Sequence, residues 1–169
     1  DGTVADNDEA YFASPNEVFK LAAGKPIYAK ASIQFTEANT DDAIVFFGFG
    51  SAIAANFLVD NGAGMRTTGD VLGIYKVDGS TVWKTISQVN GTAVTNTSVT
   101  TAGDSSYQKL EVEVVDHDTT AGYATFKCNG DYLKDSNGLV IRHRVPYASS
   151  TEMQVGFGVK NGDTNLETL

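Results

Sequence analysis

Residues 76–100, KVDGSTVWKTISQVNGTAVTNTSVT, contain two dipeptides that suit tight hairpin turns, Asp78-Gly79 and Asn90-Gly91. Both central residues of a type I′ turn have positive φ, a conformation that Asn, Asp and Gly adopt at low cost. The flanking residues are mainly Thr, Val, Ser, Ile and Trp, which favour a pleated, half-buried surface over a helix. The stretch therefore predicts three short antiparallel strands, and no nucleophile, base or metal cluster is evident in it.

The same alternation of apolar and polar residues recurs along the chain. In residues 27–35, IYAKASIQF, every second side chain is apolar, which predicts a strand with one face in water. Residues 43–50, AIVFFGFG, are apolar on both faces, as in a central strand that is covered on both sides. Further strands are expected at 71–77, 110–115, 123–128, 139–145 and 153–159.

About ten short strands joined by Gly- and Asn-containing turns predict an all-β fold, a two-sheet antiparallel jelly-roll β-sandwich. One short helix is expected at 51–58, where Ser51 suits an N-cap before an Ala-rich stretch, and residues 59–70 are expected to form a Gly-rich loop. The core is expected to contain Ile27, Ala29, Ile33, Phe35, Phe46, Leu110, Val112, Val114, Phe126, Val155 and Phe157.

Composition restricts the organisation and the partners. The 169 residues fit one domain, and 12 basic against 21 acidic side chains give a net charge of −9, which argues against nucleic acid as a partner. Residues 1–18 carry five acids and no base, so they are expected to form a solvated arm before a sandwich at 19–169. No apolar run is long enough to span a membrane, and a membrane is not expected as a partner.

Two acidic motifs invite a chemical interpretation. Glu111 and Glu113 share one face of a strand, as the carboxylates of a sandwich glycosidase do, but such enzymes also need an aromatic-lined cleft, and alternating Glu on a solvated face is the commoner situation. Asp116 and Asp118 flank His117 in a loop and offer a weak alternative as metal ligands, although the spacing of a calcium loop is missing. We therefore expect no enzyme activity and no cofactor, and we expect Asp116, His117 and Asp118 to form a polar turn.

Four other side chains are candidates for contact with a ligand or partner, or for the core. Trp83, the only tryptophan, can stack on a ligand if it is exposed, and does not contact one if it is in the core. Arg142 and Arg144 lie on the polar face of their strand and are candidates for contact with an acidic partner. Cys128 alternates with apolar residues and is expected to be a buried small hydrophobe.

Four segments carry a resemblance to known proteins: GKPIYAKASIQFTEANTDDAIVFFGFGSA (24–52), DNGAGM (60–65), KVDGSTVW (76–83) and SSTEMQVGFGVKNGDTNLETL (149–169). They resemble concanavalin A-like, or laminin G-like, jelly rolls of tailed-phage structural gene clusters. The resemblance implies a head decoration or cement protein that binds the major capsid protein lattice on the virion exterior, and it carries no active-site motif. The alternative is a lectin-like carbohydrate-binding module, such as a receptor-binding or fibre domain, that binds a glycan.

Self-association is expected from the open edges of the sheets. Lys84 is the only charged side chain between residues 81 and 100, so few charges there block edge pairing. A homo-oligomer, a trimer or a dimer, is the predicted assembly.

Overall fold

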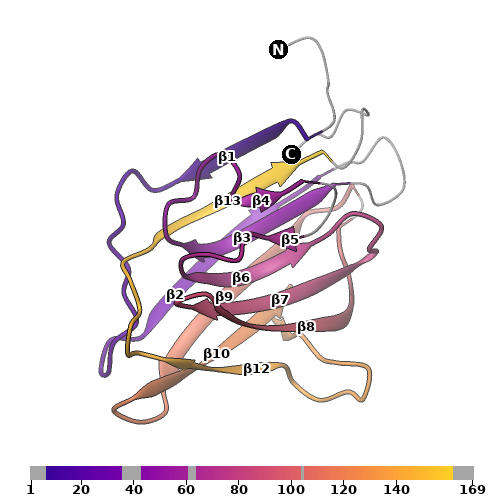
Figure 1. Cartoon of the computed structure of the whole chain (residues 1–169). Helices are drawn as coiled ribbons and strands as arrows, with labels where there is room; N and C mark the ends of the chain where they lie inside the picture. Colours follow the sequence, from indigo (N-terminus) through magenta and orange to yellow (C-terminus); the bar gives the residue numbers. More distant parts are fainter. Residues whose placement is uncertain (1–6, 36–42, 61–63, 104, 162–169) are drawn as a thin grey trace.

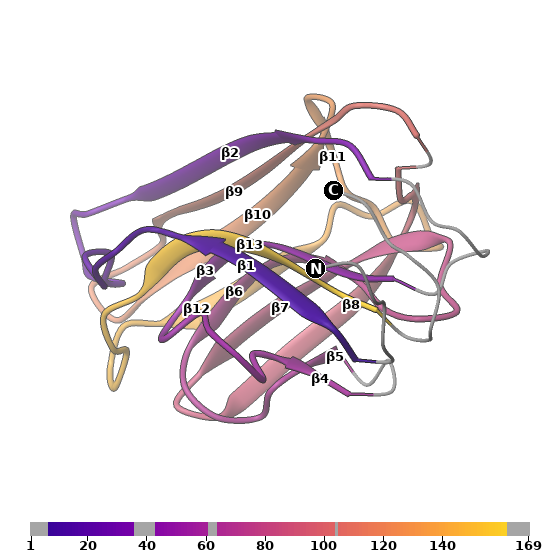
Figure 2. The same ribbon diagram turned by 90° about the horizontal axis from the view of Figure 1, so that it is seen from above.

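The chain folds into two facing antiparallel sheets, in a computed structural model that describes residues 7–35, 43–60, 64–103 and 105–161 (Figures 1 and 2). The six-stranded sheet has the order β1 (Glu9–Ala13), β13 (Gln154–Lys160), β3 (Ile44–Gly50), β6 (Val71–Lys76), β7 (Val82–Val89) and β8 (Thr92–Thr101). The five-stranded sheet has the order β11 (Asp131–Tyr132), β10 (Ala121–Cys128), β9 (Gln108–Asp116) and β2 (Ile27–Ile33), with β12 (Arg142–Pro146) also paired to β10. These findings confirm the predicted sandwich.

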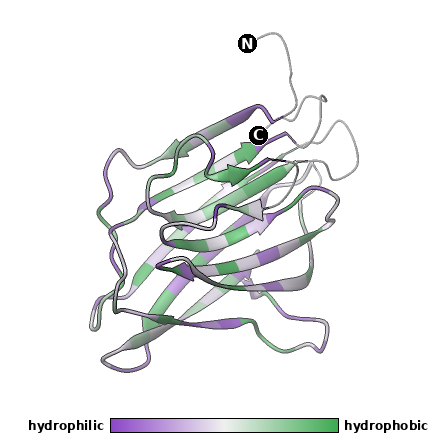
Figure 3. Ribbon diagram, in the orientation of Figure 1, coloured by the Kyte–Doolittle hydropathy of each residue, from purple (hydrophilic) through white to green (hydrophobic). Residues whose placement is uncertain are grey.

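The main core lies between the two sheets. Alternate side chains of β2, β9 and β10 point into it, and the alternation of apolar and polar residues along the strands is visible as green and purple segments in Figure 3. Eight of the eleven predicted core residues are buried there: Ile27, Ala29, Ile33, Phe35, Leu110, Val112, Val114 and Phe126. Val155 and Phe157 only pack against this core and stay half-buried.

A second core covers the outer face of the six-stranded sheet. Residues 51–60 and 64–65 lie over this face and include the small hairpin of β4 (Leu58–Val59) and β5 (Gly64–Met65). Phe57 packs edge-on against Phe46 with ring centroids 5.0 Å apart. Phe46 is therefore buried, but in this second core. A Cβ at Gly50 would lie 2.6 Å from the Phe57 ring, so the close packing requires glycine there.

The predicted helix at 51–58 is wrong. Its residues form turns, and Ala52 and Asn56 have φ of 50° and 63°, which interrupts a right-handed helix. Ser51 and the Ala-rich stretch suggested a helix, whereas Ile53 and Phe57 of this segment lie over the sheet and are buried in the second core. The expected Gly-rich loop at 59–70 likewise contains part of a short hairpin.

The boundary placed at residue 18 also needs correction, because Glu9–Ala13 form the edge strand β1. It pairs with β13 in an antiparallel register that runs from Glu9 opposite Lys160 to Ala13 opposite Gly156. The Lys160 ammonium is buried and bonded to the Glu9 carboxylate at 3.1 Å and to Asp60. The acidic composition suggested a solvated arm. Glu9 of this strand instead neutralises the buried Lys160. Residues 1–6 lie outside the described part.

The two turn dipeptides of 76–100 behave differently. Asn90 and Gly91 have φ of 49° and 76°, as a two-residue type I′ hairpin between β7 and β8 requires. Around Asp78-Gly79 only Gly79 has positive φ, and β6 ends at Lys76 while β7 begins at Val82, so this connection is a longer loop. In the described segments no helix is long and apolar enough to cross a membrane.

Candidate binding cleft

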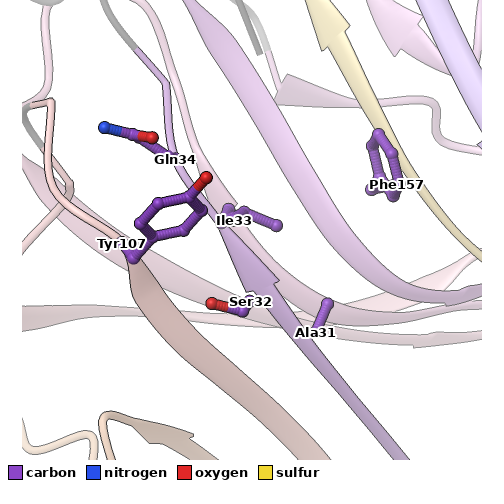
Figure 4. Close-up of a pocket in the computed structure, with 6 residues that line it drawn as sticks. All are labelled: Ala31, Ser32, Ile33, Gln34, Tyr107 and Phe157. Carbon is purple, nitrogen blue, oxygen red and sulfur yellow. The ribbon is translucent and has the colours of Figure 1, made fainter.

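A cleft of about 280 Å³ lies at the outer edge of β2, with Phe157 of β13 on its other side. Ala31, Ser32, Ile33, Gln34, Tyr107 and Phe157 line it (Figure 4). Among the described strands, β2 is the last of its sheet, so its outer edge has no described strand as partner. The cleft therefore combines apolar walls with backbone polar groups that no described strand pairs.

Aromatic rings stand on both sides of the cleft. Tyr107 is 70% exposed, and Figure 4 shows its ring on one side of Ile33 and the Phe157 ring on the other. Phe12 of β1 stacks on Phe157 at a centroid distance of 5.5 Å and is itself 67% exposed. Exposed aromatic side chains this large favour contact with a ligand or a partner.

Two hydrogen bonds fix the position of Tyr107. The Gln34 amide donates to the Ser105 carbonyl at 2.7 Å, and the Ser105 N–H donates to the Phe35 carbonyl at 3.0 Å. Ser105 is thus held at the end of β2, and Tyr107, two residues later, is brought to the mouth of the cleft. The Tyr107 hydroxyl makes no hydrogen bond with a described residue, so it is available to a ligand.

Trp83 is not part of any exposed site. Its side chain is fully buried between the sheets, packs edge-on against Phe35, and donates from Nε1 to the Gln108 side chain at 2.7 Å. The interpretation of Trp83 as an exposed platform is therefore wrong. The weak alternation of its strand concealed this, since β7 also points Thr85 and Ser87 inward.

Asp116 and Asp118 are occupied by contacts within the protein. Asp116 accepts hydrogen bonds from the Gly24 N–H at 2.6 Å and the Tyr147 hydroxyl at 2.5 Å. Asp118 accepts from the Thr120 hydroxyl and two backbone N–H groups, and these bonds lower the pKa of its carboxyl to about 2. Among the described residues no group of three or more acidic, His or Cys side chains is arranged to hold a metal ion. The motif forms a capped turn.

Glu111 and Glu113 lie on the outer face of the five-stranded sheet, and neither lines the cleft. Glu111 forms an ion pair with Lys30 at 2.8 Å and accepts from the Tyr28 hydroxyl at 3.0 Å. The hydrogen bond from Lys30 is the largest cause that lowers the pKa of this carboxyl. A general acid for glycoside cleavage needs the opposite shift, so the arrangement does not suit catalysis.

The remaining sequence candidates divide between surface and core. Arg142 and Arg144 are exposed on β12, on the same face as the glutamates. Cys128 is buried as predicted, and burial raises the pKa of its thiol. His143, inside the sandwich, bonds to Thr85, Ser87 and Asn96.

Sequence reasoning did not identify the cleft. Phe157 was assigned to the core by its alternation, and Tyr107 precedes its strand in a segment without a pattern. The sequence offered one signal: Phe12 is a large apolar residue in a segment, 1–18, that carries five acids and no base.

Two solved structures share this fold. The carbohydrate recognition domain of Emp47p, in a monoclinic crystal form, is 14% identical with a TM-score of 0.54, and the match covers 98% of this chain and 76% of that one. The metal-free carbohydrate recognition domain of Emp46p is 10% identical with a TM-score of 0.59 and the same coverage. No protein-family model and no curated protein sequence matches the chain. The chain thus has a concanavalin A-like jelly-roll fold.

Proposed function

We propose that this protein is a non-catalytic, carbohydrate-binding module whose glycan site is the cleft at the free edge of β2. The observation that carries the proposal is the pair of aromatic rings, Tyr107 and Phe157, on either side of a cleft that also presents Gln34 and Ser32. Sugars present apolar C–H faces that stack on aromatic rings and hydroxyls that bond to amide, hydroxyl and backbone groups. Concave sites with apolar walls and a few polar groups are typical of small-ligand binding.

The fold supports this proposal over an enzymatic one. Both similar solved structures are named as carbohydrate recognition domains. The carboxylate pair of Glu111 and Glu113 lies outside the cleft, and Glu111 is held ionised by Lys30. A binding module with no paired acid and base at its cleft fits these observations.

Glycan binding by the whole chain tests the proposal. The chain is screened against an array of neutral oligosaccharides, and the dissociation constant of a hit is measured by calorimetry for the native protein and for Tyr107→Ala. Removing the ring should weaken binding about tenfold, since truncating an aromatic contact commonly costs 1–2 kcal/mol. Leu139→Ala, which shortens an exposed apolar side chain outside the cleft lining, is the matched control. An array with no hit, or equal weakening by both variants, would contradict the proposal.

A role as a decoration protein on a phage head is the second candidate. It rests on the resemblance of the four segments above to phage structural domains and not on the solved structures. Under this candidate the protein is a homo-oligomer, a trimer or a dimer, bound to the major capsid protein lattice. Its uncharged edge strand β8, exposed from Thr92 to Thr97, is available for edge pairing between subunits.

Copy counting separates the two candidates. Mass spectrometry of purified particles from the source virus should find this chain at a number tied to the lattice if it decorates the head. A few copies per particle together with glycan binding would favour a receptor-binding or fibre module, and absence from particles would exclude the decoration role.

A further inference from the structure

Basic side chains gather on the outer face of the five-stranded sheet. The alternation of β2, β9, β10 and β12 directs five of them to this face: Lys30, Lys109, Lys127, Arg142 and Arg144. Of the described residues in these strands, only two that point to this face are acids, Glu111 and Glu113. We call this surface the basic face. Its seven charged strand side chains carry a net charge of +3; the whole chain carries −9, so the other residues together carry −12.

Two of these cations, Lys109 and Arg142, have no partner among the described residues. Lys30 is paired with Glu111, and Arg144 lies 3.7 Å from Asp118. Arg142 and Lys109 are exposed, and their side chains form no hydrogen bond or ion pair with the described residues. Like charges kept together without compensating acids repel one another, and an anion bound from outside would relieve that repulsion.

Tyrosine rings lie among the cations. Tyr28 and Tyr132 are 51% and 42% exposed, and the Lys127 ammonium lies 4.7 Å from the centroid of the Tyr132 ring. Tyr123 projects from β10 next to Val115 on the same face. The face therefore offers both charge and flat apolar area, on strands whose same-face residues repeat about every 7 Å.

From this arrangement we infer that the basic face binds an acidic polysaccharide, a chain of sugars that carries repeated carboxylates or sulfates. The cations match the repeated negative groups, and the tyrosine rings match the C–H faces of the sugars between them. A face formed by four adjacent strands offers an extended polymer a continuous surface, in contrast to the cleft, which suits a short saccharide. The inference rests on the proposed glycan-binding function and specifies the class of glycan for a second surface.

Two other occupants fit less well. A second copy in a closed two-fold dimer would place this face against itself and bring five cations against five. Nucleic acid is more densely charged than an acidic polysaccharide and would meet the −12 of the other residues wherever it extends past the face. Charges on the far side of the sandwich are largely screened at physiological salt, where the Debye length is about 8 Å.

The test uses polygalacturonate as the probe and dextran as the neutral polymer, with binding to the whole chain measured by calorimetry at about 20 and 300 mM NaCl. The native protein should bind polygalacturonate and lose about tenfold in affinity at the higher salt. The double variant R142Q/R144Q should bind about tenfold more weakly at low salt, the sum of two exposed charge contacts. Lys20→Gln with Lys84→Gln changes the net charge equally on other surfaces and should leave binding unchanged.

The outcomes separate this inference from the proposed function. Loss of polygalacturonate binding in R142Q/R144Q, with Tyr107→Ala unaffected, supports a second glycan surface. Binding of a neutral oligosaccharide without any binding of polygalacturonate overturns the inference and leaves the proposed function standing. Equal weakening by the control pair assigns the effect to net charge and overturns the inference. Tighter binding of duplex DNA or polyglutamate, lost in R142Q/R144Q, assigns the face to a different class of polymer.

Discussion

Acid should destabilise this protein through one buried histidine, His143. Its side chain is 1% exposed and lies between the sheets, where Nε2 is 2.9 Å from Asn96 Oδ1 and Nδ1 is 2.9 Å from Ser87 Oγ. Because a carbonyl oxygen only accepts, Nε2 carries the proton and the Ser87 hydroxyl donates to Nδ1. The neutral ring is fully satisfied, and burial lowers its pKa from 6.5 to about 4.

The sign and size of the effect follow from proton linkage. Between pH 6.5 and 4 the unfolded chain binds a proton at His143 that the folded chain does not, so stability falls as the pH falls through this window. Going from pH 7.5 to pH 4.5 should cost about 2.5 kcal/mol through this residue alone.

Urea unfolding at both pH values measures the effect. His143→Gln removes the titrating group and keeps an amide that donates and accepts, so this variant should lose about 2.5 kcal/mol less than the native protein. His117→Gln removes the exposed histidine and should lose as much as the native protein. If native protein and His143→Gln lose equal stability on acidification, the reasoning is refuted. The imidazole resonance gives a second measurement, since His143 should not titrate above about pH 5.

Three further predictions concern the fold. Phe126→Ala should lower the free energy of unfolding by about 3–5 kcal/mol because Phe126 is fully buried. Val94→Ala, at a half-exposed position, should lower it by less than about 0.5 kcal/mol. A loss below about 1 kcal/mol for Phe126→Ala in urea titrations would contradict the core assignment. Deleting residues 1–13 removes β1 and the Glu9 partner of buried Lys160, and should lower the urea midpoint by an amount equivalent to about 3 kcal/mol or more; an unchanged midpoint would show that β1 contributes nothing. Asn90→Ala places a β-carbon at φ 49° and should cost about 1 kcal/mol, so equal thermal midpoints for variant and native protein would argue against the type I′ turn.

The sequence alone predicted the sandwich because strands and tight turns are local features. Alternation in residues 27–35 and 110–115 marks which side chains share a face, and β2 and β9 pair with their apolar residues in register, Ala29 opposite Val112. Asn90-Gly91 and Asn129-Gly130 both adopt positive φ, since these residue types accept that conformation. Period and turn chemistry need no knowledge of distant contacts.

Alternation does not show whether a strand face is buried under another part of the chain. Which faces are buried depends on segments that lie far apart in the sequence. Glu9–Ala13 form a strand because they pair with β13, about 150 residues later in the chain, where Glu9 also binds the buried Lys160. Residues 51–58 do not form the expected helix, because burial of Phe57 against Phe46 on the outer face of β3 stabilises the chain more than a helix this short would.

The cleft and the basic face belong to the tertiary structure as well. Tyr107 and Phe157 lie 50 positions apart in sequence and flank the same cleft only because β2 ends its sheet beside β13. The five cations of the basic face come from four strands, and the net charge of −9 of the whole sequence does not reveal that they lie together. A strand's own residues determine its two faces, but contacts between distant strands determine which face is buried, which is exposed and which side chains meet there.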